Sequence, residues 1–475
     1  MSLQETSTTT PTIRSSAGAK ASRPAVILAV LAMASFLAQL DVWITNVGLP
    51  SIGTGVGARS LSDLSWVLNG YAIVYAALLV PAGRLADRFG RKPGFLLGLG
   101  IFGAASVGAA FSGDIWVLVG FRALQAVGAA VMTPASLGLV LTTAPPEKVG
   151  KYVKIWFTSG ALSATAGPVV GGLLLEASWR WLFLVNIPVV IAAVVLAVKL
   201  VPNTKHEQDV RFPDLFGGLV LIVAVGSLAL GLVEGPSWGW GSGRFIAAAV
   251  VAAVGVAGFI LRSARHDVPV IQLSLFRDRI FSAANLTALL AFASFSILLL
   301  SAILWMQGHW HYSAIRTGLG SAPGPVMFAV FAGVAETLQV RFKMPAAVVA
   351  SVGFVIAAVG GIMMATLLHN SPNYASGLLP TWIVLGLGFG LAVPTTITFA
   401  TVDLPPEQAA TGSAIVSMAL QLGAVIGISS LVAILGTASA GADLDVFRSA
   451  WFVAAGLSAV SILTVTGISP RKPAF

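Results

Sequence analysis

One feature recurs along the whole chain: continuous apolar runs of about 20 residues, separated by short polar segments. In helical conformation, a run of that length crosses the hydrocarbon core of a bilayer, which is about 30 Å thick. The runs do not alternate between polar and apolar residues, as the strands of a membrane β-barrel would. The pattern therefore predicts an all-α integral membrane protein.

The number of runs predicts the number of membrane-spanning helices. We place 14 spans, at about 24–48, 64–83, 95–112, 114–135, 152–175, 181–201, 214–233, 244–262, 281–304, 315–337, 345–368, 377–400, 408–435 and 447–467. Charged residues make up only 9% of the 475 residues, against roughly 25% in soluble proteins, as expected when lipid covers most of the surface. An even number of spans places both termini on one side.

The distribution of basic residues indicates which side that is. Of the 27 Lys and Arg residues, 21 fall in the segments on the side of the N-terminus and five on the opposite side. Cytoplasmic loops carry such an excess, so we expect both termini in the cytoplasm and a multi-pass protein of the cell (inner, or cytoplasmic) membrane. The net charge of +9 is then an orientation signal, and we expect no nucleic-acid partner. The chain has no cysteine, which excludes disulfides and thiol chemistry.

Two longer, more polar loops, at about 202–213 and 263–280, divide the spans into six, two and six. The predicted organisation is a disordered cytoplasmic tail (1–23), an N-terminal six-helix bundle (24–201), loops with two additional helices (202–280), a C-terminal six-helix bundle (281–467) and a second cytoplasmic tail (468–475). Two bundles of equal size suggest an internal repeat about an axis along the membrane normal. We expect the two extra helices to pack at the periphery of the bundles.

Five segments carry a resemblance to a known family. They are LDVWITNVGLP (40–50), GRLADRFGRK (83–92), FRALQAVGAA (121–130), SGALSATAGPVVGG (159–172) and WRWLFLVNIP (179–188). In their order and spacing, the chain resembles the 14-span drug:proton antiporter branch of the major facilitator superfamily. Trp43 and Ala126 depart from the Thr and Gly that are usual in that branch.

The resemblance implies a proton-coupled antiporter that exports hydrophobic or amphiphilic small molecules (multidrug efflux) by alternating access. The proton gradient would supply the energy, with no cofactor, and a monomer surrounded by membrane lipid would be the expected form. One alternative is a dedicated exporter of a single endogenous metabolite or lipid, and another is a transporter-like membrane sensor. An enzyme is not expected, because all five His residues lie in loops or at span edges and no nucleotide-binding P-loop is present.

Asp41 and Arg122 are ionisable residues inside apolar spans. A charge there costs at least several kcal/mol unless it faces a cavity or a partner. At 1.5 Å per helical residue both lie at similar depth in the outer half, so they could pair or approach through water. Burial disfavours the charged carboxylate and a guanidinium favours it. We hypothesise that Asp41 takes up a proton from outside and that Arg122 tunes it; a static ion pair between two helices is the alternative.

The segment between spans 2 and 3 is the most charged in the first third of the chain. Its residues of interest are Gly83, Arg84, Asp87, Arg88, Gly90, Arg91 and Lys92. The Asp87 carboxylate can accept hydrogen bonds from a neighbouring arginine or face a helix N-terminus, and the glycines permit a tight turn. The resemblance implies a cytoplasmic latch between the halves; a plain orientation signal is the alternative. A degenerate echo of this motif follows span 10, where Glu336 and Arg341 form a possible second gate.

Span 5 carries the residues that the resemblance associates with antiport and with sealing the outer half. They are Gly160, Gly167, Pro168, Gly171 and Gly172. Proline removes one helical hydrogen bond, and small residues allow helices to approach closely, so we expect a kink and a smooth face. Ordinary close packing is the alternative interpretation.

The substrate cavity has weaker candidates. Polar side chains in spans tend to face protein or a cavity, and methionine and aromatic residues adapt to varied shapes. On these grounds the candidates are Asn46, Trp66, Tyr71, Gln125, Met132, Trp305 and Gln307. No metal site is expected. His309 and His311 form a His-x-His in an outer loop and are expected to be solvated.

Overall fold

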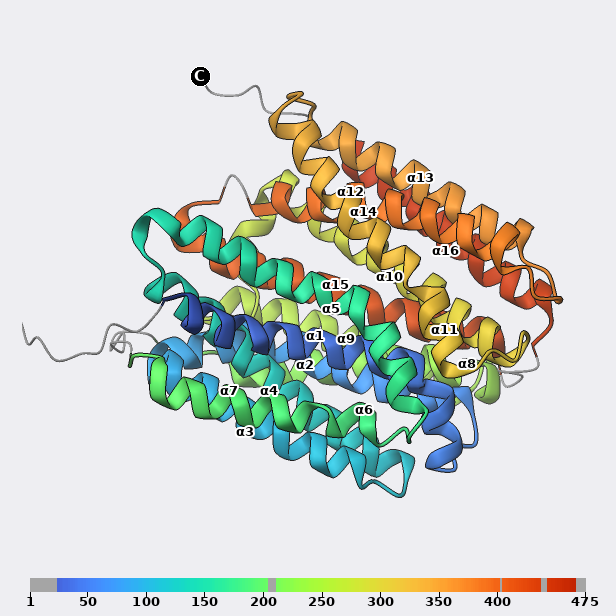
Figure 1. The fold of residues 1–475 in the computed structure, drawn as a ribbon, viewed down its shortest axis with the longest axis horizontal. Coiled ribbons are helices and arrows are strands. Elements are labelled where there is room, and N and C mark those ends of the chain that lie inside the picture. Colours follow the sequence, from blue (N-terminus) through green and yellow to red (C-terminus); the bar gives the residue numbers. More distant parts are fainter. Residues whose placement is uncertain (1–23, 204–210, 402–403, 437–441, 467–475) are drawn as a thin grey trace, which may run out of the picture.

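The computed structural model describes residues 24–203, 211–401, 404–436 and 442–466, so the predicted tails at 1–23 and 468–475 lie outside the described residues. Within the described ranges the chain is helical and contains no β-strand. Fourteen helical segments are long and apolar enough to cross a membrane, which confirms the predicted fold class and the number of spans. Figure 1 shows these helices running side by side, with the N-terminal ones (blue to green) below most of the C-terminal ones (yellow to red).

The first six spans comprise seven helices. They are α1 (Pro24–Gly55), α2 (Leu61–Phe89), α3 (Arg91–Ala110), α4 (Ile115–Thr143), α5 (Val149–Leu175), α6 (Trp181–Leu184) and α7 (Asn186–Leu200), with a 3₁₀ turn, η1 (Pro146–Lys148), before α5. The sixth span is thus broken between α6 and α7. Side-chain caps begin two of the helices: Ser60 accepts a hydrogen bond from the backbone N–H of Asp63, and Asp114 from that of Trp116.

Most of the predicted loop at 83–92 is helical. α2 continues to Phe89 and α3 starts at Arg91, so Gly90 alone separates them, with φ +107°. The apolar run ends near Gly83, but Leu85, Ala86 and their charged neighbours are compatible with a helix, and α2 therefore extends beyond the hydrophobic segment. The turn is confined to the one residue that tolerates a positive φ.

The remaining eight spans are α8 (Leu215–Trp238), α9 (Gly243–Arg265), α10 (Arg279–Gly308), α11 (Ala314–Ser321) with α12 (Pro323–Val340), α13 (Ala346–Leu367), α14 (Leu379–Thr401), α15 (Pro406–Leu435) and α16 (Leu444–Thr466). A 3₁₀ turn, η2 (Leu273–Arg277), precedes α10, and a π turn, η3 (Tyr374–Leu378), precedes α14. The span formed by α11 and α12 changes helix at Ala322.

The two halves repeat one packing device. A Cβ added to Gly98 on α3 would lie 2.8 Å from the backbone oxygen of Gly128 on α4, and one added to Gly128 would lie 2.8 Å from the oxygen of Gly98. Gly353 on α13 and Gly388 on α14 make the same reciprocal contact, at 2.7 and 2.8 Å. Both pairs join the third and fourth spans of a six-span half. The recurrence supports an internal repeat and shows how close these helices approach.

The two additional helices differ in their surroundings. α8 packs against α2 of the first half and α15 of the second, through a buried cluster that includes Ala76, Leu221, Val225 and Met418. α9 packs on α8 and leaves residues such as Val254 exposed. α9 is therefore peripheral, as expected, whereas α8 covers the seam between the halves.

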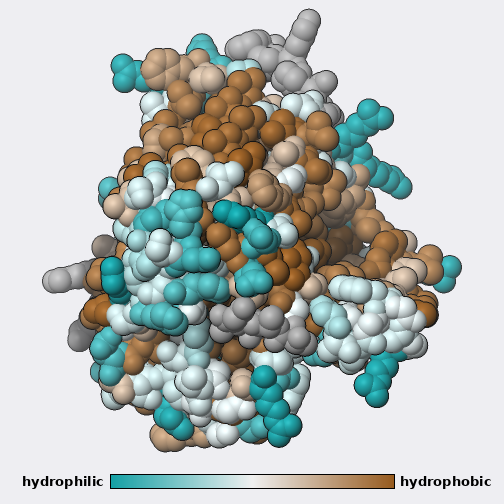
Figure 2. Space-filling view, turned by 90° about the vertical axis from the view of Figure 1, so that its right-hand side faces the viewer, coloured by the Kyte–Doolittle hydropathy of each residue, from teal (hydrophilic) through white to brown (hydrophobic). Residues whose placement is uncertain are grey.

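Large apolar side chains also cover much of the surface. Ile191, Val198, Val254 and Leu463 are each more than half exposed, which is unfavourable in water and suits a surface that faces lipid. In the end-on view of Figure 2, apolar residues cover the upper flank, while hydrophilic residues gather toward the end that faces the viewer.

Candidate functional site

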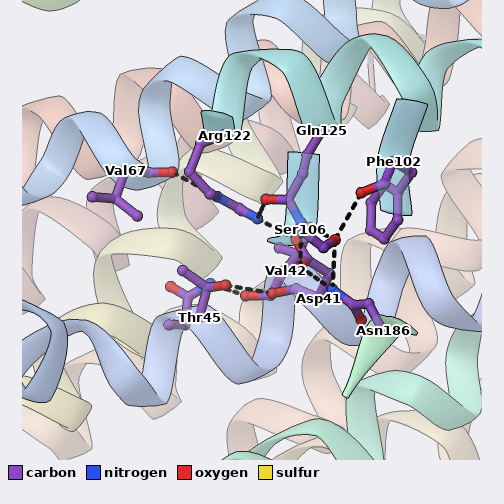
Figure 3. Close-up of polar contacts among 10 residues, drawn as sticks. Asp41, Val42, Thr45, Val67, Phe102, Ser106, Arg122, Gln125 and Asn186 are labelled. Atoms are coloured by element: carbon purple, nitrogen blue, oxygen red, sulfur yellow. Dashed lines mark hydrogen bonds and ion pairs between the residues drawn. The ribbon is translucent and has the colours of Figure 1, made fainter. Parts of the chain in front are cut away.

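The polar centre of the N-terminal half is an ion pair between helices α1 and α4. Nη1 of Arg122 donates to Oδ2 of Asp41, and the two side chains are 1% and 0% exposed. The pair forms directly, which was one of the two arrangements expected from their common depth. Figure 3 shows it enclosed by the surrounding helices.

Two amide side chains complete the environment of the carboxylate. Nδ2 of Asn186 donates to Oδ1 of Asp41 at 3.0 Å, and Nε2 of Gln125 donates to the same oxygen at 3.2 Å. Both amides also donate to Oγ of Ser106, at 3.3 and 2.8 Å, and Ser106 itself donates to the backbone oxygen of Phe102. Every described side-chain partner of Asp41 is a hydrogen-bond donor, so both carboxylate oxygens are paired within this network.

Sequence reasoning missed Asn186 and Ser106. Asn186 is the first residue of α7, directly after the break in the sixth span. A polar residue beside a helix break in an otherwise apolar span was an available signal, and it lies within the WRWLFLVNIP segment. Ser106 gave no signal, because an isolated serine in a membrane helix commonly bonds to its own backbone.

The guanidinium of Arg122 has a second set of contacts. Its Nε donates to the backbone oxygen of Val67 on α2 at 3.2 Å, and its Nη1 also donates to Oε1 of Gln125 at 2.9 Å. The aromatic ring of Tyr71 lies 4.4 Å from the guanidinium carbon, which is a cation–π distance. Arg122 therefore joins α1, α2 and α4 at one point.

A cavity of about 60 Å³ adjoins this ion pair between the two halves. Its walls come from α1, α2 and α4 on one side and from α10 and α15 on the other. The lining residues are Val42, Trp43, Asn46, Leu68, Tyr71, Ala72, Arg122, Phe292, Phe295, Ser296, Leu299, Gln421, Ala424 and Ile428. Arg122 thus lines the cavity, while Asp41 lies behind it.

Only part of the predicted substrate set lines this cavity. Asn46 and Tyr71 do, and Gln125 lies behind them in the Asp41 network. Met132 is packed in the core of the N-terminal half, and Trp66 packs against the cluster between α2, α8 and α15. The aromatic wall from α10 could not be singled out from the sequence, since its phenylalanines have no distinguishing neighbours.

Trp305 and Gln307, at the C-terminal end of α10, also lie away from the cavity. Trp305 is fully buried and stacks on the ring of His309, with the ring centroids 3.9 Å apart. Gln307 instead connects the halves, because its Nε2 donates to the backbone oxygen of Val47 on α1 at 3.0 Å.

His309 was expected to be solvated, and the structure contradicts this. Besides the stacking on Trp305, its Nε2 lies 2.9 Å from the backbone oxygen of Ala442. This burial lowers the pKa of His309 below its ordinary value, despite the opposing effect of the Ala442 oxygen. A solvated loop position was expected because the sequence does not show that α16 begins beside the end of α10.

Three charged residues of the motif at 83–92, Asp87, Arg91 and Lys92, form hydrogen bonds within the N-terminal half. Asp87 accepts a hydrogen bond from Nε of Arg91 at 2.7 Å, and Nη1 of Arg91 donates to the backbone oxygen of Gly138 on α4 at 2.9 Å. Nζ of Lys92 donates to the backbone oxygen of Val201, just after α7, at 2.6 Å. These bonds tie α2 and α3 to α4 and to the end of α7, and they do not reach the C-terminal half.

The other residues of this motif are placed individually. Gly83 lies inside α2, where an added Cβ would be 3.3 Å from Pro134 of α4. Arg84 is on the same helix with its Nε buried. The guanidinium of Arg88 lies 5.9 Å from the ring centroid of Phe212, in the segment before α8.

A polar contact between the halves does occur near the echo of the motif. Nζ of Lys154 on α5 lies 2.9 Å from both carboxylate oxygens of Glu336 on α12. The two side chains are 67% and 59% exposed, so this pair contributes little to stability. Arg341, the other predicted gate residue, is the residue that follows α12, and its side chain forms no ion pair within the described chain.

The span 5 motif presents two faces. Cβ atoms added to Gly160, Gly167 and Gly171 would meet α1; for Gly171 the distance to the Cα of Ile44 would be 3.1 Å. Gly172 faces the C-terminal half, because an added Cβ would lie 2.7 Å from the Cα of Ile315 on α11.

Proline 168 contributes to the same contact with α11. A Cβ on Gly318 would overlap the backbone oxygen of Pro168, and α5 continues as a helix on both sides of this proline. The C-terminal part of α5 thus joins the halves through near contact of two backbones.

Comparison with known proteins gives consistent matches. The family model described as Major Facilitator Superfamily matches residues 31–428. The tetracenomycin C resistance and export protein of Streptomyces glaucescens is 34% identical over 436 residues, which cover 90% of this chain and 78% of that protein. The multidrug resistance protein Stp of Mycobacterium tuberculosis is 32% identical, over 84% of this chain and 74% of its own. The methylenomycin A resistance protein of Streptomyces coelicolor is 30% identical, over 91% and 90%.

Solved structures share the fold. The crystal structure of the POT family transporter PepTSo superposes with a TM-score of 0.69 at 16% identity, over 94% of this chain and 97% of the other. A POT family transporter in complex with 5-aminolevulinic acid gives a TM-score of 0.67 at 13% identity, over 93% and 95%. At this level of identity the similarity concerns the arrangement of helices alone.

Proposed function

Because this chain belongs to the Major Facilitator Superfamily and is a multi-pass membrane transporter, we propose that it is a proton-coupled antiporter that exports hydrophobic or amphiphilic small molecules by alternating access. The names of its relatives, which denote resistance to and export of antibiotics, support export as the direction of transport. The basic loops support an orientation with both termini in the cytoplasm.

The observation that carries proton coupling is the buried Asp41–Arg122 pair beside the cavity between the halves. Among the described residues, Asp41 is the one carboxylate that forms an ion pair with a residue lining that cavity. A proton taken up by Asp41 removes its charge, weakens its bond to Arg122 and releases the joint between α1, α2 and α4. Protonation at this point can therefore favour one arrangement of the halves over the other.

The other motifs have supporting roles in this proposal. The bonds of Arg91 and Lys92 hold the inner ends of the N-terminal helices together as one body. The contact of α5 with α11 closes the outer end, and the Lys154–Glu336 pair joins the halves at the inner end. Asn46 and Tyr71 contact the substrate, and the proposed working form is a monomer in the lipid bilayer.

The test is transport by the purified full chain in proteoliposomes, with a panel of fluorescent lipophilic compounds and an imposed pH gradient. The wild type is expected to move at least one compound against its gradient, and Asp41→Asn is expected to lose this dependence on the pH gradient. Asp445→Asn is the matched control, since that carboxylate is 86% exposed at the start of α16. Undiminished gradient-driven transport by Asp41→Asn would refute the coupling role.

Export of a single dedicated compound is the second candidate, and a specific observation favours it. Two of the relatives are named for one antibiotic each, tetracenomycin C and methylenomycin A. Two strains, one with the gene deleted and one that overexpresses it, separate the candidates. A difference in resistance to many unrelated compounds indicates multidrug export, and a difference for one compound indicates a dedicated exporter.

A further inference from the structure

The charge around the central cavity has one sign. Among its lining residues Arg122 is the only side chain that is charged at neutral pH, and no aspartate or glutamate lines it. Asp41 is fully buried behind the guanidinium. The ion pair is neutral as a whole, but its positive end faces the cavity, and a bound molecule meets a cation and hydrogen-bond donors first.

Several polar groups at the cavity have unused hydrogen-bonding capacity. Nε and Nη1 of Arg122 are engaged by Val67, Asp41 and Gln125, whereas its Nη2 has no acceptor within the described chain. Across the cavity, the hydroxyl of Ser296 on α10 and the amide of Gln421 on α15 make no hydrogen bond to described residues. These groups face one space from both halves and can bind one polar group together.

The rest of the lining is aromatic. Trp43 on α1 contacts Phe295 on α10 edge to face, with the ring centroids 5.8 Å apart, and Phe292 lies 5.6 Å from Phe295. Tyr71 adds a fourth ring beside the guanidinium. Flat apolar walls with one polar corner suit an aromatic ring that carries a single polar substituent.

The size of the cavity shows what binding requires. A volume of about 60 Å³ holds only a few water molecules, whereas pockets that bind drug-sized ligands measure roughly 300–1,000 Å³. Because the walls come from both halves, separation of the halves enlarges the cavity and leaves the Arg122 guanidinium on the N-terminal half. The guanidinium is therefore available to a ligand that enters before the halves close.

We propose that this site selects aromatic compounds that carry an anionic oxygen, such as a carboxylate or phenolate, and that Nη2 of Arg122 binds that oxygen with help from Ser296 and Gln421. The proposal rests on the transport function above and names the substrate class of the same cavity. Lipophilic cations are disfavoured, since they meet the guanidinium with no carboxylate in reach.

The arrangement has a consequence for coupling. A proton on Asp41 leaves Arg122 with more of its charge for a bound anion, so direct electrostatics favours binding of proton and anion together. Mutual exclusion of proton and substrate must then come from the movement of the halves and not from competition for one group. Asp41→Asn, which mimics the protonated residue, is therefore expected to bind the anion more tightly than the wild type does.

The experiment measures binding by isothermal titration calorimetry to the purified full chain in detergent. The probes share one ring system and differ in charge: 2-naphthoate, 2-naphthylmethanol and (2-naphthylmethyl)trimethylammonium. For the wild type, 2-naphthoate is expected to bind at least about tenfold more tightly than either other probe, as a charge-assisted hydrogen bond provides. Asp41→Asn is expected to tighten 2-naphthoate binding several-fold, and Gln421→Leu to weaken it several-fold. Gln39→Leu, at an exposed position of α1, is the matched control and is expected to bind as the wild type does.

The outcomes separate this proposal from the transport function. Tightest binding of the ammonium probe, or weaker naphthoate binding by Asp41→Asn, overturns the substrate class even if gradient-driven export is observed. Absence of binding by all three probes in a chain that exports a dye overturns the site. Binding with the expected order and signs supports the site, even where the proteoliposome assay shows no gradient-driven export and the coupling proposal fails.

Discussion

The contact between α5 and α11 makes the sharpest prediction. Replacing Gly172 by alanine places a Cβ 2.7 Å from the Cα of Ile315, whereas carbon atoms pack at about 3.5–4.0 Å. The neighbour is backbone, which cannot rotate away, so the two helices must separate by about 1 Å. The contact lies near the C-terminal end of α5, and Gly172→Ala is therefore expected to favour the conformation in which the halves are apart at that end.

The size of this effect follows from the cost of overpacking. Inserting a methyl group into a tight contact costs about 1–3 kcal/mol, which changes the ratio of two conformations about 5- to 150-fold. Alanine is also a better helix former than glycine by roughly 0.5–1 kcal/mol, but this gain applies to both conformations. Gly333→Ala on α12 isolates the helix effect, because an added Cβ there meets nothing within 4 Å.

Distance measurements between spin labels provide the assay. The chain has no native cysteine, so cysteines at Thr54 and Asn370, exposed positions in the two halves, can be labelled without background. Gly172→Ala is expected to shift the distance distribution to longer values, and Gly333→Ala to leave it unchanged. A wild-type distribution in Gly172→Ala, with the protein folded, would refute the reasoning.

Two further predictions concern other contacts. Asn186→Ala removes a hydrogen bond to a buried carboxylate and is expected to lower the free energy of unfolding by about 1.5–3 kcal/mol. In thermal unfolding, Asn186→Ala should lose more stability than Asn285→Ala, which removes an amide that bonds to its own helix. An equal loss in the two variants would contradict this prediction. The pKa of His309 is lower in the folded chain than in the unfolded chain, so the unfolded chain binds a proton more readily. The stability that the neutral ring provides is therefore lost as pH falls below about 6.5, the ordinary pKa of histidine. His309→Phe should therefore flatten the decline in melting temperature between pH 7.5 and 5, whereas His311→Asn should not.

The features that follow from local sequence were predictable. Apolar runs determine the number of spans, and helical rise places Asp41 and Arg122 at one depth. The predicted end of the second span, at residue 83, was wrong for the helix, because hydropathy marks where lipid contact ends and not where the helix ends. The C-terminal wall of the cavity could not be predicted, since Phe292 and Phe295 differ from the chain's other phenylalanines only in what the folded halves bring opposite them.

The contacts of α5 indicate where the molecule can move. Its C-terminal part is held to α11 by the near contact of two backbones at Gly172 and Pro168. Its N-terminal part is joined to α12 by the exposed Lys154–Glu336 pair, which is worth about 0–1 kcal/mol. Pro168, where the contact with α11 begins, also removes one helical hydrogen bond and so lowers the cost of bending. From the described conformation, separation of the N-terminal end of α5 from α12 therefore costs less than separation of its C-terminal end from α11, and a glycine-to-alanine change at the α11 contact reverses that order.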